Sequence, residues 1–319
     1  MKTIDVFNGD ADGICSLLQL RQASPCDSTL VTGIKRDIKL LEKVQAGPGD
    51  MITVLDISLD KNRSDLVRNL ESGAKVFYVD HHFCGEIPND VNLTTLINTD
   101  SNICTSLLVN QHLDNKHYLW AITGAFGDNL KVSARTLARQ HQLAENDTEQ
   151  LLPLGIYLNY NGYGADINDL HFAPDQLFQK LLSYRNPLDF IHDSSSAYQQ
   201  LKSGYEEDNA NVSHIKVEYQ TDKIALFILP DETWARRISG VYSNELANQS
   251  PDRAHAVLTQ NKQNGYLISV RAPLNNKTGA DELCRQFESG GGRKAAAGIN
   301  HLPKTDLQLF IDKFNLQFK

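Results

Sequence analysis

The sequence predicts an α/β protein with a parallel sheet in its first half and a smaller α+β domain in its second half. Three observations carry this prediction. In the first half, short apolar segments alternate with stretches of helical periodicity, the order that builds a parallel sheet. A mostly helical stretch follows, and β-type segments then return. With 319 residues, the chain is long enough for two domains that each bury a core.

Four apolar segments of the first half are predicted to be strands of one sheet that is buried on both faces. These segments are 3–7, 28–34, 51–55 and 75–79. The segments between them have helical spacing or helical composition, at 14–20, 37–44 and 59–70. Ligands of such sheets bind beyond the carboxyl ends of the strands, so the residues directly after each strand are the first candidates for a functional site.

The domain boundary is predicted after the helical stretch 103–182. Asn186-Pro187 and the polar run 193–196 interrupt the pattern there. We therefore expect a first domain over 1–190, a linker over 191–215 and a second domain over 216–319. The second domain is expected to contain strands at 224–229, 254–258 and 266–270, and helices at 235–247, 281–287 and 307–314.

Charge and cysteine usage narrow the class of protein. The formal charge of −8 and the pI of about 5.7 argue against a protein that coats duplex DNA. The part from Asn264 onward is mildly basic, with eight Lys and Arg against five Asp and Glu, which suits an anion ligand.

The five cysteines form no CxxC pair, so we expect neither a disulfide framework nor a zinc knuckle. No apolar run is long enough for a membrane span and no signal peptide is recognisable, so we expect a cytoplasmic protein without membrane partners.

Acidic clusters follow three of the predicted strands. Asp10 and Asp12 come after the first, Asp56 closes the third, and Asp80-His81-His82 closes the fourth. Each motif alone is also typical of a turn, a helix cap or an incidental pair. Together they place several carboxylates at one edge of a sheet, where mutual repulsion costs stability unless cations lie between them. Oxygen ligands with an imidazole suit Mn²⁺ or Mg²⁺, and Asp128, after a helical segment, would complete a binuclear site.

A glycine-rich motif near the C-terminus is the candidate anion site. Three consecutive glycines, Gly290, Gly291 and Gly292, leave backbone N–H groups open to an anion, and Arg293 adds positive charge. Arg271, at the end of a predicted strand, is a second candidate for binding phosphate. A plain turn and a surface arginine are the alternative interpretations.

In this order and spacing, the motifs resemble those of the DHH–DHHA1 phosphoesterases. The matching residues are Asp10-x-Asp12, Asp56, Asp80-His81-His82, Asp128 and Gly290-Gly291-Gly292-Arg293. The resemblance covers essentially the whole chain. It implies an N-terminal DHH domain with a parallel sheet flanked by helices, a linker, and an α+β DHHA1 domain that binds substrate. Members hydrolyse phosphodiesters or phosphomonoesters with Mn²⁺, and include nanoRNases and RecJ-type exonucleases.

The resemblance also implies roles for individual residues. Asp10 would bind a first metal ion and Asp12 a second, with Asp56 bridging the two. His81 and Asp128 would complete the second ion's shell, and Asp80 would support the first ion or orient a ligand. Contacts with substrate would come from His82, Thr105, Ser106, Arg271, Gly290, Gly291, Gly292 and Arg293.

Two positions depart from the family pattern. Many members have a His where this chain has Val6, and RecJ-type members have an Asp where it has Asn8. An amide oxygen can ligate Mn²⁺ but carries no charge, so we expect Asn8 to weaken the first metal position. Many nanoRNases have His where this chain has Arg293, which affects substrate specificity.

The function expected is that of a phosphodiesterase with two Mn²⁺ ions, or Mg²⁺ in their place, acting on very short nucleic acids such as pGpG. The acidic charge and the length of the chain favour a dinucleotide over a long single strand. A phosphomonoesterase for pAp or a polyphosphate-type substrate is the alternative enzyme. A nucleotide sensor with a degenerate metal site is the alternative outside catalysis. A second copy of the chain is the expected protein partner.

Overall fold

A computed structural model describes all 319 residues, which form two compact units, Met1–Ser203 and Gly204–Lys319. The predicted linker 191–215 contains the end of one helix and all of helix α9 (Tyr198–Val212), within which the two units divide. None of the helices combines the length and the apolar composition that a bilayer-spanning segment requires.

The first unit is built on a five-stranded parallel sheet with strand order β2-β1-β3-β4-β5. Its strands are β1 (Thr3–Phe7), β2 (Thr29–Val31), β3 (Met51–Leu55), β4 (Lys75–Asp80) and β5 (Leu93–Ile97). Its helices are α1 (Ala11–Ala23), α2 (Leu59–Glu71), α3 (Thr105–His112), α4 (Tyr118–Gly127), α5 (Lys131–Gln140), α6 (Glu145–Asn161), α7 (Pro174–Leu182) and α8 (Pro187–His192). Short 3₁₀ turns, η1 (Leu40–Lys43) and η2 (Ile167–Asp169), complete it.

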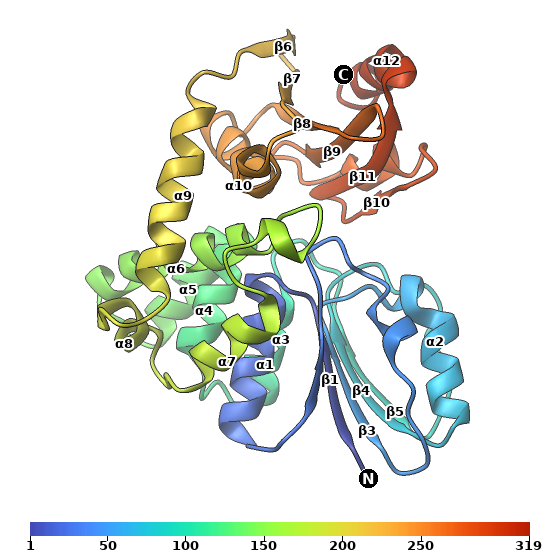
Figure 1. Cartoon of the computed structure of the whole chain (residues 1–319), viewed down its shortest axis with the longest axis vertical. Coiled ribbons are helices and arrows are strands. Elements are labelled where there is room, and N and C mark those ends of the chain that lie inside the picture. The colour runs from blue at the N-terminus through green and yellow to red at the C-terminus, as the bar shows by residue number, and fades with distance from the viewer. The chain divides into compact units, whose positions relative to one another are not determined.

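Helices cover both faces of this sheet, α2 on one side and α1, α3 and α4 on the other (Figure 1). Alternate residues of each strand therefore enter different cores. On β1, Ile4 and Val6 pack toward α2, while the buried Asp5 faces α1 and binds Arg21 there. Burial on both faces explains why the strands are nearly continuous apolar runs.

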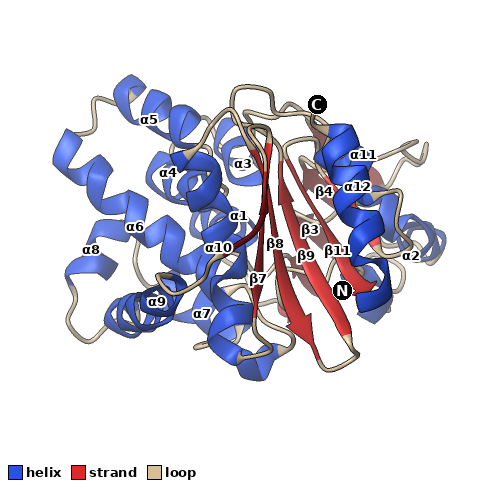
Figure 2. Ribbon diagram, turned by 90° about the horizontal axis from the view of Figure 1, so that it is seen from above, coloured by secondary structure: helices blue, strands red, loops and turns tan.

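The second unit contains a six-stranded mixed sheet with strand order β10-β11-β9-β8-β7-β6. Its strands are β6 (Val217–Gln220), β7 (Ile224–Leu229), β8 (Ala254–Asn261), β9 (Gly265–Arg271), β10 (Gly290–Gly292) and β11 (Ala296–Pro303). Helix α10 (Thr233–Gln249) lies on one side of this sheet, and α11 (Ala280–Cys284) and α12 (Leu307–Gln317) lie on the other (Figure 2). The 3₁₀ turn η3 (Lys304–Asp306) precedes α12.

The fold class predicted from the sequence is confirmed, with differences in individual elements. The segment 37–44 contains a 3₁₀ turn and no α-helix, and β2 is shorter than the predicted strand 28–34. Strands β5, β6, β10 and β11 were not predicted. Of these, β5 and β6 are only partly buried, so they lack the alternation that a one-sided strand shows.

Candidate metal centre

The acidic residues predicted to form a site gather at the carboxyl edge of the first sheet. Parallel strands end at the same edge, so the loops after β1, β3 and β4 bring their side chains together. Asp10, Asp12, Asp56, Asp80 and His81 are each at most 3% exposed.

The loop after β1 places two carboxylates at the start of α1. Asp10 is the N-cap, and its Oδ1 accepts hydrogen bonds of 3.1 Å from the N–H groups of Asp12 and Gly13. Gly13 has to be glycine, because a Cβ there would lie 2.2 Å from the carbonyl oxygen of Asn8. A close backbone approach therefore sets the turn from β1 into α1.

Asp12 is held by a segment far away in sequence. Its two carboxylate oxygens accept from the backbone N–H groups of Thr105 and Ser106, at 2.7 and 2.8 Å, at the N-terminus of α3. The Thr105 hydroxyl also donates to Asp56 Oδ1 at 3.2 Å. Thr105 and Ser106 are both fully buried, so in this structure they orient the carboxylates.

Asp56 follows β3 in the left-handed region, with φ of 60°. Among non-glycine residues, Asp is one of the few that adopt this region readily. This conformation directs the carboxylate into the acidic cluster directly at the end of β3. The backbone N–H of Asp56 donates to the Val79 carbonyl oxygen at 3.1 Å.

His81 presents one nitrogen to three carboxylates. Its Nδ1 lies 2.8 Å from the Ile103 carbonyl oxygen, which can only accept, so Nδ1 carries a proton and the ring turns Nε2 toward the carboxylates. That Nε2 lies 3.3 Å from Asp56 Oδ1, 3.7 Å from Asp12 Oδ2 and 3.9 Å from Asp128 Oδ2. Metal-binding histidines are oriented in the same way, by a hydrogen bond from their other nitrogen.

Asp80 and His82 form a pair beside this group. His82 Nδ1 lies 2.7 Å from Asp80 Oδ1 and 3.9 Å from Asp56 Oδ1. Asp56, His81 and His82 each offer a ligand atom within 4.8 Å of the others. The side chain of His82 is 25% exposed, so it is the accessible member of the set.

The charges of the cluster affect one another. Burial, together with the charges of Asp12, Asp10 and Asp128, raises the pKa of Asp56 well above its usual range. Burial also acts to raise the pKa of Asp10, but the charge and hydrogen bond of Lys35 outweigh it and lower that pKa. A divalent cation would relieve the repulsion among the remaining carboxylates.

The residues present fit a hard divalent cation. Two buried oxygens of the cluster, Asn8 Oδ1 and Asp80 Oδ2, have no hydrogen-bond partner. Two cysteines lie nearby, but burial raises the pKa values of Cys15 and Cys104 well above the usual thiol value. The donor set is thus oxygen with one imidazole, which suits Mn²⁺ or Mg²⁺ better than zinc.

Lys35 belongs to this cluster and was missed by the sequence analysis. It comes shortly after β2, and its ammonium contacts Asp10 Oδ2 and lies 3.0 Å from Asn159 Oδ1. The signal that could have found it is the same one that found the aspartates, a polar residue after a predicted strand of the parallel sheet.

The predicted substrate residues of the second unit meet at one end of its sheet. Arg271 pairs with Ala296 across β9 and β11, and Ala296 is hydrogen-bonded to Arg293 across a tight turn. The guanidinium of Arg271 donates to Asn244 Oδ1 at 2.6 Å and to the Gly240 carbonyl oxygen at 3.3 Å, both on α10. These two bonds fix the direction of its side chain.

The expectation of a glycine-rich loop is corrected by the structure. Gly290, Gly291 and Gly292 form the edge strand β10, antiparallel to β11, and only Arg293 and the residues after it make the turn. The outer edge of β10 still offers its backbone to a ligand at Gly291. A Cβ there would meet nothing within 4 Å, so the space beside this residue is open. Gly290 has no such freedom, because a Cβ there would lie 1.8 Å from the Cys284 carbonyl oxygen.

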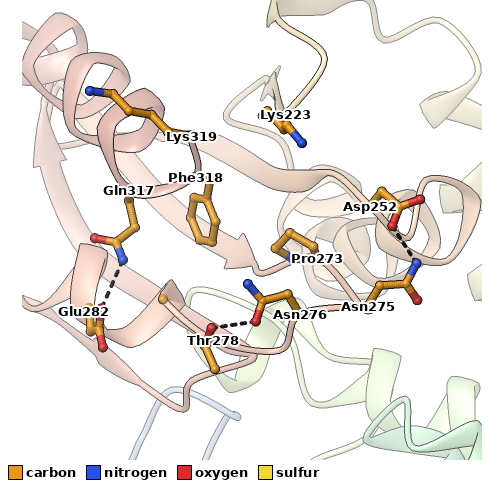
Figure 3. A pocket seen from close by; sticks show the side chains of 11 residues that line it. Lys223, Asp252, Pro273, Asn275, Asn276, Thr278, Glu282, Gln317, Phe318 and Lys319 are labelled. Atoms are coloured by element: carbon orange, nitrogen blue, oxygen red, sulfur yellow. Dashed lines mark hydrogen bonds between the residues drawn. The ribbon is translucent and has the colours of Figure 1, made fainter.

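A polar pocket of about 430 Å³ also lies in the second unit. Figure 3 shows that its polar side chains pair with one another, as Asn275 does with Asp252 and Gln317 with Glu282. Neither Arg271 nor the 290–293 segment lines this pocket, so it is not the predicted anion site.

Comparison of the fold with solved structures gives matches over nearly the whole chain. The exonuclease RecJ bound to manganese is 15% identical, with a TM-score of 0.58, over 99% of this chain and 89% of that chain. PggH from Vibrio cholerae, a pGpG-specific phosphodiesterase, is 13% identical, with a TM-score of 0.54, over 99% of this chain and 100% of that chain. The chain therefore shares its fold with RecJ and PggH, in agreement with the fold that the resemblance to the DHH–DHHA1 phosphoesterases implies.

A third match shows the same DHH–DHHA1 fold within a longer protein. RecJ from Thermus thermophilus in complex with Mn²⁺ is 17% identical, with a TM-score of 0.58, and this chain covers 52% of it. No family model and no curated protein sequence matches the chain. The fold predicted from the DHH motifs is thus confirmed by structures of low sequence identity.

Proposed function

We propose that this protein is a Mn²⁺-dependent phosphodiesterase that hydrolyses very short oligonucleotides, with 5′-phosphorylated dinucleotides such as pGpG as its substrates. The observation that carries the proposal is the convergence of Asp12, Asp56 and Asp128 on Nε2 of His81. The manganese in the RecJ structures and the substrate named for PggH support the choice of metal and substrate.

The proposed ligands divide into two halves that share Asp56. Asp12, His81 and Asp128 form one half, called here the His81 half. Asn8, Asp10 and Asp80 form the other half, called here the Asn8 half. A divalent cation in such a site lowers the pKa of water and offsets the negative charge of a reacting phosphate.

The neighbouring residues would keep Asp12 and His82 in their orientations. Thr105 and Ser106 hold Asp12 through their backbone N–H groups, so its two oxygens keep their direction when a substrate enters. His82 is oriented by Asp80 through Nδ1, which leaves Nε2 for an oxygen of the scissile phosphate. With both nitrogens protonated, His82 would neutralise charge that develops on that oxygen.

In the second unit, Arg271 and Arg293 would bind the terminal phosphate of the substrate. A guanidinium pairs with two phosphate oxygens at once, and the contacts of Arg271 with α10 pre-orient it for this role. The overall charge of −8 disfavours a long polyanion and is compatible with a dinucleotide.

The test is a substrate panel with the metal-free chain and added Mn²⁺. The panel contains pGpG, pApA, a ten-nucleotide RNA, a cyclic dinucleotide and pAp, and products are separated by chromatography. We expect mononucleotides from the linear dinucleotides, loss of activity with a chelator, recovery with Mn²⁺ and poor recovery with zinc. Release of phosphate from pAp without cleavage of any dinucleotide would contradict the proposed diesterase. Full activity in a preparation shown to be metal-free by elemental analysis would contradict the metal site.

A further inference from the structure

Lys35 is held firmly at the acidic cluster. Its backbone N–H donates to the Gly162 carbonyl oxygen at 2.8 Å, and its ammonium lies 5.5 Å from the centre of the Tyr163 ring. The ammonium contacts Asp10 and Asn159, and only 22% of the side chain is exposed. Its position is therefore fixed by backbone, ring and carboxylate contacts together.

The two halves of the proposed site differ in charge. The His81 half contains Asp12 and Asp128 and shares Asp56, and all three carboxylates face Nε2 of His81. In the Asn8 half, a neutral amide stands where a carboxylate would add charge. Both oxygens of Asp10 are already engaged there, Oδ1 by the N–H groups that start α1 and Oδ2 by Lys35.

An ammonium and a metal ion compete for the same carboxylate. Lysine is charged at neutral pH, and a cation bound to Asp10 would have to displace Lys35 or lie close to it. Like charges at such distances repel strongly in a buried site. The direct contacts of Lys35 are with Asp10 and Asn159, outside the His81 half, whereas its effect on Asp56 and Asp128 is electrostatic.

We propose that Lys35 is a built-in counter-ion of the Asn8 half, so that the protein binds one Mn²⁺ tightly, in the His81 half, and a second one only weakly. This inference rests on the metal site of the proposed function. It assigns Lys35 a positioning role, because the residue acts through Asp10 and determines how many cations the site retains.

The experiment counts Mn²⁺ ions on the full-length protein. Metal-free wild type is titrated with Mn²⁺, and free Mn²⁺ is measured by electron paramagnetic resonance and bound metal by elemental analysis after dialysis. We expect one tight ion in the wild type. In Lys35→Met, which keeps most of the side-chain stem but removes the charge, we expect the second ion to bind at least tenfold more tightly. Lys35→Gln, which keeps a polar group toward Asp10 and Asn159, provides a second neutral variant.

Lys39→Met is the matched control, since Lys39 is exposed and lies in the same segment. It should retain one tight ion. Two tight ions in the wild type, or an unchanged second affinity in both folded Lys35 variants, would overturn the role of Lys35. Thermal melts followed by circular dichroism show that each variant is folded.

The outcome separates this inference from the proposed function. A chain that cleaves pGpG and binds two ions tightly contradicts the counter-ion role and leaves the phosphodiesterase intact. A chain that binds one ion tightly, gains a second in Lys35→Met and cleaves nothing in the panel supports the counter-ion and contradicts the phosphodiesterase alone.

Discussion

His255 is expected to make the second unit sensitive to acid. It lies in the centre of the sheet, on β8 between Ala225 of β7 and Arg271 of β9, and is 2% exposed. Its Nδ1 has no hydrogen-bond partner. Burial, helped by the charge of Arg253, lowers the pKa of His255 to about 4, although a backbone hydrogen bond with Arg253 acts the other way.

The size of the effect follows from proton linkage. The unfolded chain binds a proton at His255 near the ordinary pKa of 6.5, whereas the folded chain does so only near 4. Between these values the unfolded state holds more protons, so stability falls as the pH falls. The loss is about 2 kcal/mol at pH 5 and about 3 kcal/mol at pH 4, relative to pH 7.

The assay compares wild type with His255→Gln, which cannot take up a proton. Urea unfolding is measured at pH 7, 6 and 5 through the fluorescence of Trp234, the tryptophan of the second unit, with Trp120→Phe present in every variant. Other groups titrate in both wild type and His255→Gln. The quantity of interest is therefore the difference between the two proteins in how the free energy of unfolding changes with pH. The exposed His214, replaced in His214→Gln, is the matched control.

We expect the wild type and His214→Gln to lose about 2 kcal/mol more than His255→Gln between pH 7 and pH 5. Equal losses in all three proteins would refute the reasoning. That result would mean that His255 titrates alike in the folded and unfolded chains, and hence that it is hydrated in the native state.

Three further predictions concern the site and the first sheet. Asp56→Asn should lower turnover more than tenfold and weaken Mn²⁺ binding without lowering the melting temperature of the metal-free chain, because it relieves acidic crowding and Asn also adopts the left-handed backbone of this position; activity within tenfold of wild type would contradict the assignment. Arg271→Ala should weaken transition-state binding by about 2–4 kcal/mol in kcat/KM. Its Mn²⁺ content should be unchanged, and a loss of metal would contradict a role limited to substrate. Arg21→Met should lower the free energy of unfolding by about 3–5 kcal/mol in urea titrations, because it leaves the buried Asp5 without its charged partner and with only the Ser28 hydroxyl as a donor to its side chain. A loss below 1 kcal/mol would show that water replaces the guanidinium at Asp5.

The sequence alone determined the sheet and most of the acidic cluster. The apolar segments of β1, β3 and β4 are long enough to be recognised, and each is followed at once by Asp or by Asp and His. Parallel strands bring their carboxyl ends to one edge whatever the details of the helices. The proximity of Asp10, Asp56 and Asp80 therefore follows from local patterns and one rule of topology.

The tertiary structure decided how these residues are oriented and how their charges are compensated. Asp12 receives two N–H groups from α3, about ninety residues away in the chain, and His81 receives its orientation from the Ile103 carbonyl oxygen. Lys35 reaches Asp10 only because of how the segment after β2 packs. Such contacts depend on where loops and helices settle on the sheet, and no periodicity in the sequence encodes that.

The contrast between local sequence patterns and tertiary packing also applies to the glycine-rich segment of the second unit. Its composition indicates a close approach of backbone at Gly290 to Gly292, and the structure confirms this at Gly290 and Gly292. Whether the partner of this backbone is a ligand or another strand depends on long-range pairing, and β11 takes that place along one edge. Local sequence therefore determined which residues carry charge and where chains can approach closely, whereas tertiary packing decided which of these groups face one another, because those contacts join residues distant in sequence.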